Sequence, residues 1–451
     1  MSEVTIHVGD CIEQMRNIPD ESVDTVITSP PYWGLRDYGG GGKVWGNHLC
    51  IRDDDTYVNH EWEGYTRPSE NTRKNNNSLQ LKSAYWEPQE QAFCKHCDAW
   101  FGQLGLEPTP EQYVKNMVKV FDEVKRILKP QGTLWLNLGD SYCAGTRKTG
   151  KGDSMHDGDL RGKSGLRNQA SGHLKNKDLV GIPWRVAFAL QEAGWWLRQD
   201  IIWAKPNCMP ESVKDRCTKN HEYMFLLTKS QNYYFDHEAI KEPVTGSSKP
   251  DKKAYAFKYG DDDSWAKDGD ISRKSKATGI AEARTKNYAK RNKRSVWWVG
   301  PKPFPEAHFA VFPIELIEPC VLAGTSERGC CAECGAPYKR SVETKLPPTR
   351  EVKLAGPQQA HGLLGSKRFD EPILTKTTGW LPTCNCDTTD VIPSVVFDPF
   401  GGAGTTAIAA IKHGRNAILT ELSPDYVKIA EKRISDFKKR TGLDDKGVEW
   451  L

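Results

Sequence analysis

Apolar and polar positions alternate along this chain with two different periods. Short apolar runs rich in Val, Ile and Leu have the composition of buried strands in a parallel sheet. The strands predicted from these runs cover residues 4–8, 23–27, 133–138, 196–203, 223–228, 395–398 and 416–420. Between them, apolar residues recur at the spacing of one helix face, which predicts helices at 11–18, 108–128, 183–193, 316–322 and 405–413. This alternation predicts an α/β fold.

The strand predicted at 23–27 runs into an unusual sequence, Thr28-Ser29-Pro30-Pro31-Tyr32-Trp33. Consecutive prolines carry no N–H and have a fixed φ, so the sheet must stop there. The carbonyls of Ser29 and Pro30 are then without ladder partners, beside a hydroxyl and two aromatic rings. Because open α/β sheets bind ligands at the carboxyl ends of their strands, we expect a ligand here. The alternative for this motif alone is a Pro-Pro turn whose rings cover the core.

A glycine-rich turn follows the strand predicted at 395–398. Its residues are Asp398, Pro399, Phe400, Gly401, Gly402, Ala403, Gly404, Thr405 and Thr406. Such a turn alone is a weak signal, because many nucleotide-binding folds have one, and no Lys-Ser/Thr follows at the spacing of a phosphate loop. Glu421 ends the next strand, about twenty residues past the glycines, where an acidic residue is placed for ribose hydroxyls.

Thirteen cysteines are unevenly distributed, which favours metal binding over disulfides in a chain without a secretion signal. A CxxC pair followed by glycine resembles a zinc-knuckle turn, and a CxC pair lies further along. Four thiolates in two close pairs suit a tetrahedral zinc ion. The predicted ligands are Cys331, Cys334, Cys384 and Cys386, with Cys330 as the spare.

An earlier CxxC pair is half of another possible zinc site. Its predicted ligands are Cys94, Cys97, His60 and Cys50, with His48 and His96 as alternatives. The other interpretation of this pair is two reduced surface thiols.

The net charge of +4 is small, so a nucleic-acid surface must be a local patch. Residues 241–300 carry 15 Lys and Arg against 8 Asp and Glu, with aromatic residues among them. This mixture suits contact with DNA phosphates and bases, although a solvated linker would look similar. The chain has no apolar run of about 18 residues and no signal-peptide pattern, so we expect a cytoplasmic protein with no membrane span.

Two of these motifs resemble those of the amino-methyltransferases, which methylate exocyclic nitrogens of DNA bases with S-adenosylmethionine. The family's catalytic motif reads (Asp/Asn/Ser)-Pro-Pro-(Tyr/Phe/Trp), and Ser29, Pro30, Pro31 and Tyr32 match it at every position. The glycine-rich turn resembles the family's cofactor motif. The resemblance implies direct transfer to a base flipped out of the duplex, on which Tyr32 stacks. The cofactor-binding residues it implies are Asp10, Phe312, Pro313, Asp398, Pro399, Phe400, Gly401, Gly402, Gly404, Thr405, Thr406 and Glu421.

The catalytic motif precedes the cofactor motif, which is the permuted order of the β-type members. The resemblance therefore implies a circularly permuted, Rossmann-like sheet of seven strands in the family order 3-2-1-4-5-7-6. In this arrangement the strand at 4–8 is the third, and Asp10 faces the cofactor adenine. The strands at 196–203 and 223–228 form the hairpin edge, whose connection approaches the base. Asp200, Lys205, Pro206 and Asn207 are candidate pocket residues there.

The resulting domain plan divides the chain into core segments and insertions. The core consists of 1–45 with the catalytic motif, 105–240 with a flexible basic loop at 144–178, 301–329 with a core helix, and 391–451 with the cofactor motif. The insertions are 46–104 with a zinc site, 241–300 for target recognition, and the four-cysteine zinc module at 330–390.

The resemblance favours methylation of cytosine N4 in double-stranded DNA, because Ser at the first catalytic position is commoner among such members. Its hydroxyl can also donate to the ring N3 of cytosine. Alternatives are methylation of adenine N6, of protein glutamine or of rRNA, and an inactive, zinc-containing DNA-binding protein. A Pro319-Cys320 pair resembles a cytosine-C5 nucleophile, but it falls inside a predicted helix. A cognate restriction endonuclease is a possible partner.

Overall fold

The computed structural model describes most of the predicted core and parts of the insertions. The described residues are 2–34, 42–46, 50–51, 57–58, 62–63, 92–94, 96–97, 99–143, 173–244, 288–302, 311–347, 349–351, 367–369, 372–442 and 449–450. The chain forms two compact units. Unit 1 comprises Met1–Phe235, Ser295–Pro337 and Cys386–Leu451, and unit 2 comprises Asp236–Arg294 and Tyr338–Asn385.

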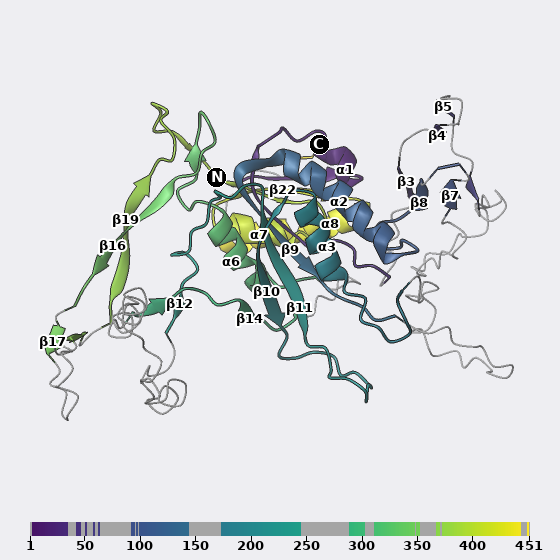
Figure 1. Cartoon of the computed structure of the whole chain (residues 1–451). Coiled ribbons are helices and arrows are strands. Elements are labelled where there is room, and N and C mark those ends of the chain that lie inside the picture. The colour runs from purple at the N-terminus through teal and green to yellow at the C-terminus, as the bar shows by residue number, and fades with distance from the viewer. Residues whose placement is uncertain are drawn as a thin grey trace, which may run out of the picture. The chain divides into compact units, whose positions relative to one another are not determined.

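Unit 1 is built on a nine-stranded sheet with the order β14-β10-β11-β9-β2-β21-β22-β1-β23 (Figure 1). The strands in that order are Val296–Trp298, Trp196–Ala204, His221–Thr228, Leu128–Leu138, Val23–Thr28, Val395–Asp398, Asn416–Glu421, Val4–Val8 and Glu449–Trp450. β11 is antiparallel to both of its neighbours, β9 and β10. The other neighbouring strands of this sheet run parallel.

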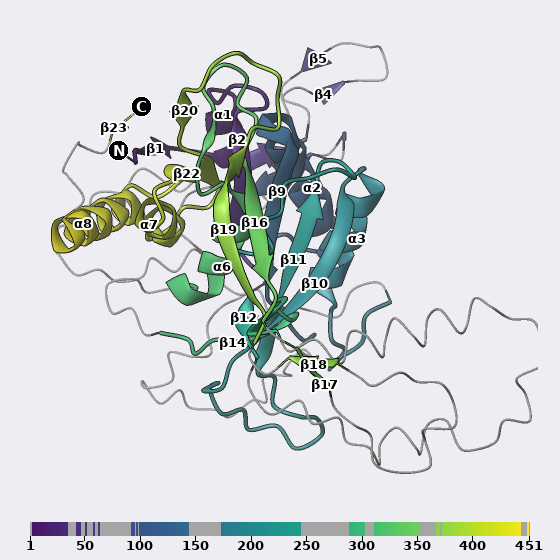
Figure 2. The same cartoon turned by 90° about the vertical axis from the view of Figure 1, so that its left-hand side faces the viewer.

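Helices cover both faces of this sheet, which explains why β2 is buried at every position. α1, α2 and α3 pack together on one face, and α6, α7 and α8 on the other (Figure 2). Their bounds are Cys11–Met15, Pro110–Ile127, Ile182–Glu192, Ile314–Gly324, Thr405–Lys412 and Pro424–Thr441. Strands covered on both faces are rich in Val, Ile and Leu, and most strands of this sheet have that composition.

Each strand and helix predicted above is present, with bounds that differ by a few residues. Thr109 caps α2 as its sequence indicates, accepting a hydrogen bond from the backbone of Gln112 at 3.2 Å, with Pro110 in the first turn. Pro319 lies inside α6, as expected. β9 differs most, because it begins at Leu128 directly after α2, where Leu128 pairs with Val23.

Smaller sheets in unit 1 have no periodic signal in the sequence. One has four strands in the order β3-β8-β7-β6, at Lys43–Trp45, Trp100–Gly102, Ala92–Cys94 and Trp62–Glu63. The others are two-stranded pairs, β4 with β5 at Cys50–Ile51 and Tyr57–Val58, and β15 with β20 at Cys330–Cys331 and Val391–Ile392. Strands this short are held by their partners rather than by their own propensity.

Unit 2 consists of paired strands, and a buried ion pair connects one of them, β16, to the segment before β12. The long hairpin pairs β16 with β19, and the shorter pairs are β17 with β18 and β12 with β13. Their bounds are Lys339–Lys345, Leu374–Leu381, Thr349–Glu351, Lys367–Phe369, Glu242–Pro243 and Lys290–Arg291. Arg340 contacts the buried Asp236 at 2.9 Å and lies over the ring of Trp380. Among the described residues of the whole chain, no helix is long and apolar enough to cross a membrane.

Candidate active site

The register of the central strands brings the two predicted motifs to the same edge of the sheet. β2 lies between β21 and β9, with Val26 opposite Phe397 and Thr28 opposite Leu136. All three strands are parallel, so the segments that follow them leave the sheet at the same end. The Ser29–Tyr32 motif and the glycine-rich turn therefore lie side by side, although 370 residues separate Thr28 from Asp398.

The side chains of the Ser-Pro-Pro-Tyr motif converge on an asparagine at the end of β9. Ser29 Oγ lies 3.3 Å from Asn137 Oδ1 and 3.3 Å from the hydroxyl of Tyr32. The Tyr32 hydroxyl is also 3.0 Å from Asn137 Oδ1. Asn137 is buried, whereas Ser29 and Tyr32 are half-buried at the edge of the sheet. The result is a small polar surface beside an aromatic ring.

A carboxylate at the start of β11 completes this network. Glu222 Oε2 accepts from the Tyr32 hydroxyl at 2.8 Å and from Asn137 Nδ2 at 3.3 Å. Its other oxygen pairs with the ammonium of Lys205, which follows β10. Of the pocket candidates in this hairpin, Lys205 thus joins the network, while Asp200 is exposed within β10. Pro206 and Asn207 are exposed as well.

Two packing contacts fix the backbone of the motif. The hydroxyl of Tyr113 in α2 donates to the carbonyl of Pro31 at 2.8 Å. Gly139 lies against the ring of Tyr32, where a Cβ atom would be 2.5 Å from Cε2. The residue that follows β9 must therefore be a glycine if the ring is to keep this position.

The buried carboxyl of Glu107 helps to hold the backbone that follows the Ser-Pro-Pro-Tyr motif. Glu107 accepts from the backbone of Gly105 at 2.8 Å and from Asn116 at 3.0 Å, and its carbonyl accepts from the indole of Trp33. Burial raises the pKa of Glu107 to about 7, against the hydrogen bonds that lower it. Gly34 in turn donates to the carbonyl of Gly105 at 2.8 Å. These contacts keep the chain after Tyr32 packed on α2.

Asp398 links the two halves of the site. One oxygen accepts from Thr28 Oγ1 at 2.6 Å and from the backbone of Phe400 at 3.0 Å, and the other accepts from Thr406 Oγ1 at 2.7 Å. The carboxyl is 1% exposed, and this burial raises its pKa to about 6 although its hydrogen bonds act in the opposite direction. Asp398 thereby fastens the end of β2 to the start of α7.

The glycine-rich turn is held over the end of β22. Gly402, at φ +50°, donates its N–H to Glu421 at 2.7 Å, and the other oxygen of Glu421 accepts from the backbone of Ser423. Burial raises the pKa of Glu421. Pro399 and Gly401 also bond to β22 through Thr420.

The end of the turn continues into α7 and packs on α8. Gly404 begins the helix at φ +75°, with Ala430 so close that a Cβ atom would lie 3.0 Å away. Arg433 of α8 donates to the carbonyl of Ala403 and to Thr405 Oγ1. The turn is therefore a rigid platform whose Gly402 and Glu421 face the ends of the strands.

The remaining cofactor candidates flank this platform. Asp10 follows β1, next to β22, caps α1 and pairs with Lys43 through both carboxylate oxygens at 2.7 Å. Pro313 is buried as the cap of α6, and Phe312 before it is half-buried.

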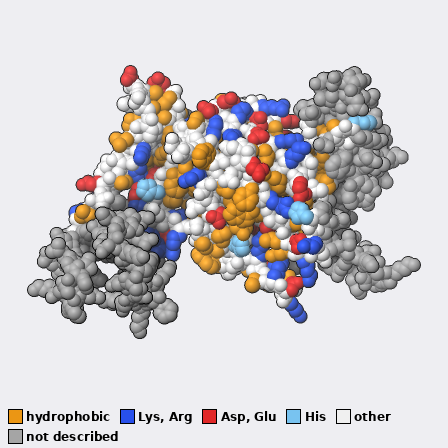
Figure 3. All heavy atoms as spheres, in the orientation of Figure 1, with side chains coloured by type: hydrophobic (Ala, Val, Ile, Leu, Met, Phe, Trp, Pro, Cys, Tyr) orange, Lys and Arg blue, Asp and Glu red, His pale blue; other side chains and the backbone are white. Residues whose placement is uncertain are grey.

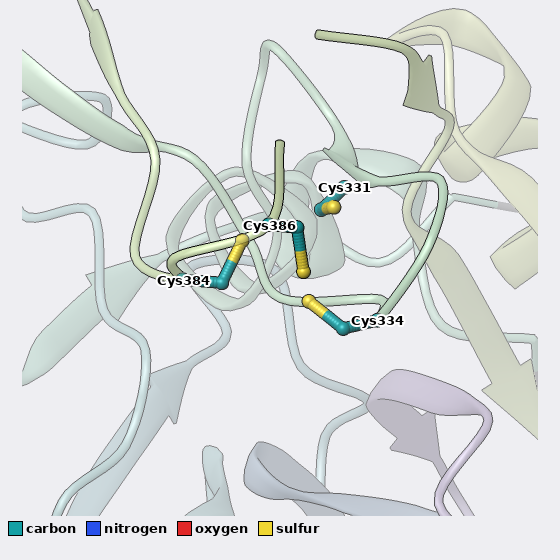
Figure 4. A group of neighbouring side chains, drawn as sticks. All are labelled: Cys331, Cys334, Cys384 and Cys386. Atoms are coloured by element: carbon teal, nitrogen blue, oxygen red, sulfur yellow. The ribbon is translucent and has the colours of Figure 1, made fainter. Parts of the chain in front are cut away.

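Four cysteine sulfurs of the predicted zinc module lie together. Cys331, Cys334, Cys384 and Cys386 have all their sulfur atoms within 4.8 Å of one another (Figure 4). The CxxC turn is tight, with Gly335 donating to the carbonyl of Cys331 at 2.9 Å and adopting φ +71°. Lys129, in a buried ion pair with Asp24 of β2, donates to the carbonyl of Gly335. The spare Cys330 packs beside that pair rather than joining the cluster.

Only half of the other predicted zinc site lies among residues with described side chains. Cys94 is buried and Cys97 half-buried, and the N–H of His96 donates to the sulfur of Cys94 at 3.5 Å. His48 and His60 lie outside the described residues, as does the side chain of Cys50.

A cavity of about 430 Å³ is separate from this site. Its lining includes Ser394, just before β21, and Gly414, just before β22, so it lies at the opposite ends of these strands. Chemistry at the carboxyl ends therefore does not use it. On the surface drawn in Figure 3, the basic and acidic side chains of the described residues are interspersed.

Two residues of the network, Asn137 and Glu222, are not among the site residues predicted from the sequence, and neither is Thr28, which binds Asp398. Asn137 gave a usable signal, because it is a polar residue inside the apolar run 133–138. Glu222 lies in a polar connection with several charged residues and has no such signal.

Comparison with known proteins identifies the family. The family model described as DNA methylase matches residues 23–332 and 390–432, which include both motifs. The type II methyltransferase M.SmaI of Serratia marcescens is 37% identical over 72% of this chain and 76% of its own. M.Cfr9I of Citrobacter freundii is 30% identical over 96% and 88%. Among solved structures, the cytosine-N4-specific PvuII DNA methyltransferase aligns with 100% of this chain and 95% of its own, at 14% identity and a TM-score of 0.43. This chain therefore belongs to the family of S-adenosylmethionine-dependent N6/N4 DNA methyltransferases.

Proposed function

We propose that this methyltransferase acts on the exocyclic N4 of cytosine in double-stranded DNA, by direct attack of the amine of a flipped-out base. The observation that carries the proposal is the Asp398 bridge, which fastens Thr28 and Thr406 to each other. It supports a single crevice at the carboxyl ends of β2 and β21, with the donor over one loop and the base over the other.

The base side supplies acceptors and a stacking ring. An exocyclic amine is a poor nucleophile because its lone pair is delocalised into the ring. Ser29 Oγ and the carbonyl of Pro30 accept hydrogen bonds from the N–H groups of this amine and thereby favour a pyramidal nitrogen. Tyr32 stacks on the base, which must leave the duplex to reach this pocket. These roles of Ser29, Pro30, Pro31 and Tyr32 follow from the family resemblance and are supported by the contacts among them.

The cofactor side fits an adenosyl group. The carboxylate of Glu421, placed by Gly402 and Ser423, keeps lone pairs for ribose hydroxyls. Gly401 and Gly402 have no side chain to block the amino-acid part, Phe312 and Pro313 lie beside it, and Asp10 faces the adenine. When bound, S-adenosylmethionine supplies an electrophilic methyl group.

The observed sheet supports the permuted β-type arrangement. From β1 to β10 its order is β1-β22-β21-β2-β9-β11-β10. We equate these strands with 3-2-1-4-5-7-6 of the family, with β23 and β14 added at the two edges.

Cytosine is preferred over adenine because the first catalytic residue is Ser29 rather than Asp. Nucleoside mass spectrometry decides between them after the enzyme has been incubated with unmethylated plasmid DNA and S-adenosylmethionine. N4-methylcytosine is expected, with none from a Tyr32→Ala variant. N6-methyladenine would replace the proposed base, and the absence of any methylated base would reject the activity.

Residues 241–300 are our choice for target recognition. Residues 245–287 lie outside the described residues. Within the described part, Trp298 is 69% exposed, and Arg291 and Arg294 share Glu242 as an ion-pair partner. An exposed indole close in sequence to arginines is typical of nucleic-acid contact. Because the relatives are named type II methyltransferases, we also propose a cognate restriction endonuclease.

We further propose that Cys331, Cys334, Cys384 and Cys386 hold a structural zinc ion. In a tetrahedral thiolate site with Zn–S of about 2.3 Å, the sulfur atoms are about 3.8 Å apart. The observed upper limit of 4.8 Å fits this with small adjustments. The buried Lys129–Asp24 pair fixes the CxxC turn in advance. Cys94 and Cys97 are proposed to bind a second zinc with His60 and Cys50, supported by the hydrogen bond to the Cys94 sulfur.

Metal analysis of the purified protein tests both zinc sites. Two zinc ions per chain are expected, falling to one in Cys334→Ser and to one in Cys97→Ser. The exposed Cys217, changed to Ser, is the matched control and should leave the zinc content unchanged. A protein that contains no zinc and has normal stability would reject both sites.

A further inference from the structure

One ion pair touches the catalytic motif but belongs to neither of its sequence signatures. Glu222 and Lys205 have side chains that are only 17% and 21% exposed. Glu222 accepts from the Tyr32 hydroxyl at 2.8 Å and from the Asn137 amide at 3.3 Å. A carboxylate in these contacts can only accept hydrogen bonds, so it dictates which way the protons of its neighbours point.

The orientation of the Asn137 amide follows from its partners. Its Nδ2 lies 3.0 Å from the carbonyl of Tyr223 and 3.3 Å from Glu222. Both partners only accept, so the amide cannot be flipped without facing two acceptors with its oxygen. Asn137 Oδ1 must therefore face Ser29 and Tyr32.

The direction of the remaining bonds can then be assigned. Tyr32 has one proton, and the charged Glu222 lies nearer to it than Asn137 Oδ1 does, at 2.8 Å against 3.0 Å. The proton of Ser29 then points to Asn137 Oδ1 or to the Tyr32 oxygen, each 3.3 Å from Ser29 Oγ. With its proton turned to either of these atoms, Ser29 Oγ presents lone pairs to a ligand.

From this chain of contacts we infer that Glu222, held by Lys205, is a positioning residue that makes Ser29 an acceptor for the N–H of the exocyclic amine. The inference rests on the proposed function and adds a residue to it. In this arrangement the Ser29 proton stays within the network and is not offered to the ring N3 of cytosine. The preference for cytosine then rests on the family resemblance of Ser29 and not on a hydrogen bond from Ser29 to N3.

The position of Glu222 suits this role. The register places Tyr223 opposite Leu138, so Glu222 lies at the level of the residue that follows Leu138. Lys205 reaches Glu222 from the end of β10, the neighbouring strand of the hairpin. Glu222 is thus carried by a strand of the sheet and Lys205 directly follows another, and strands are more rigid supports than a loop.

Replacing Glu222 by Gln tests the inference, because the side chain keeps its size and loses its charge. A Gln amide offers a donor where Tyr32 and Asn137 need an acceptor, so the direction of the bonds is no longer fixed. We expect kcat to fall about 10- to 100-fold, the loss typical when an outer partner of an active-site group is removed. KM for unmethylated plasmid DNA and the affinity for S-adenosylmethionine by calorimetry should stay within about twofold.

Three further variants separate positioning from folding. Glu222→Asp keeps the charge and should restore part of the lost kcat. In a Tyr32→Phe background, Glu222→Gln should cost less than in the wild type, because one of its two targets is already gone. Glu21→Gln is the matched control: it breaks an ion pair with Lys229, which directly follows the opposite end of β11, and its kcat should stay at the wild-type level.

The outcomes distinguish this inference from the proposed function. If wild-type enzyme methylates DNA and Glu222→Gln retains full kcat, the inference fails and the function stands. The inference also fails if Glu222→Gln loses cofactor affinity and unfolding midpoint in parallel with kcat, because the residue is then merely structural. A wild-type enzyme that methylates no DNA base rejects the function, and the inference with it.

Discussion

Asp398 serves both the fold and the candidate site, because it connects the end of β2 to the glycine-rich turn. Its carboxylate is buried, and both oxygens are used by groups of the protein itself. Its contacts therefore connect β2 to α7. We expect any contribution of Asp398 to cofactor binding to act through the turn that it supports.

The raised pKa of Asp398 predicts a pH dependence of stability. A folded-state pKa of about 6, above the ordinary 3.8, means that the native state favours the protonated form. The stabilisation is full below pH 3.8 and is lost as the pH rises through about 6. Relative to Asp398→Asn, the wild-type free energy of unfolding should therefore fall by up to about 3 kcal/mol between about pH 4 and pH 7. Urea unfolding of both proteins across this range measures the difference, and a constant difference would contradict it.

The sequence predicts residues of this site only where neighbours in the chain form a motif. Ser29 and Tyr32 are three positions apart, and the glycine-rich turn is continuous. Asn137 and Glu222 enter the same network from two other strands, and their positions depend on the register between β9 and β11. No local pattern encodes that register, so these residues become visible only in the fold.

At the scale of elements, the end of β9 shapes the pocket. Gly139 gives the ring of Tyr32 a place against the backbone. Gly139→Ala should push the ring out of position, because its new Cβ would lie 2.5 Å from Cε2. A displacement of about 1 Å can cost on the order of 100-fold in rate, so we expect a loss of this size in kcat.

A suitable control for that variant is Gly379→Ala, where a Cβ atom has nothing within 4 Å. Steady-state methylation assays should show full activity for the control, and calorimetry should show unchanged binding of S-adenosylmethionine for both. If Gly139→Ala has full activity, Tyr32 does not need this position.

Long elements were predictable because each has its own local signal. α2 has a cap, a first-turn proline and a regular apolar face, and β2 is rich in β-branched residues. The sheet that contains β3 and β8 had no such signal, because its strands are only two or three residues long and form through pairing with each other. β9 extends back to Leu128 for the same reason, since a partner strand is available there.

At the scale of the whole chain, the two halves of the site come from segments far apart in sequence. β2 pairs with β21, and β1 pairs with β22. Pairing over such separations leaves no trace in hydrophobic periodicity. Only the family resemblance implied it, through the order of the two motifs. The cysteine cluster is similar, because spacing suggested two pairs and the fold brings them together.

If the donor binds where these strands meet, it should stabilise both halves at once. At a concentration of about 100 times its Kd, a ligand of the native state adds about 2.7 kcal/mol to its stability. Hydrogen exchange should therefore slow in the peptides over 23–28 and over 395–421 when S-adenosylmethionine is added. S-adenosylhomocysteine, which lacks only the transferred methyl group, should have the same effect, and ATP should have none.

The peptide over 23–28 is the decisive one, because it contains none of the residues proposed to contact the cofactor. Protection there can reach β2 through the Thr28–Asp398 hydrogen bond and the pairing with β21. The Asp398→Asn variant should weaken this transfer while leaving the protection of 395–421 in place. If exchange in the wild type slows only in 395–421, ligand binding stabilises the glycine-rich turn without stabilising β2. That result would contradict the proposal of a single crevice.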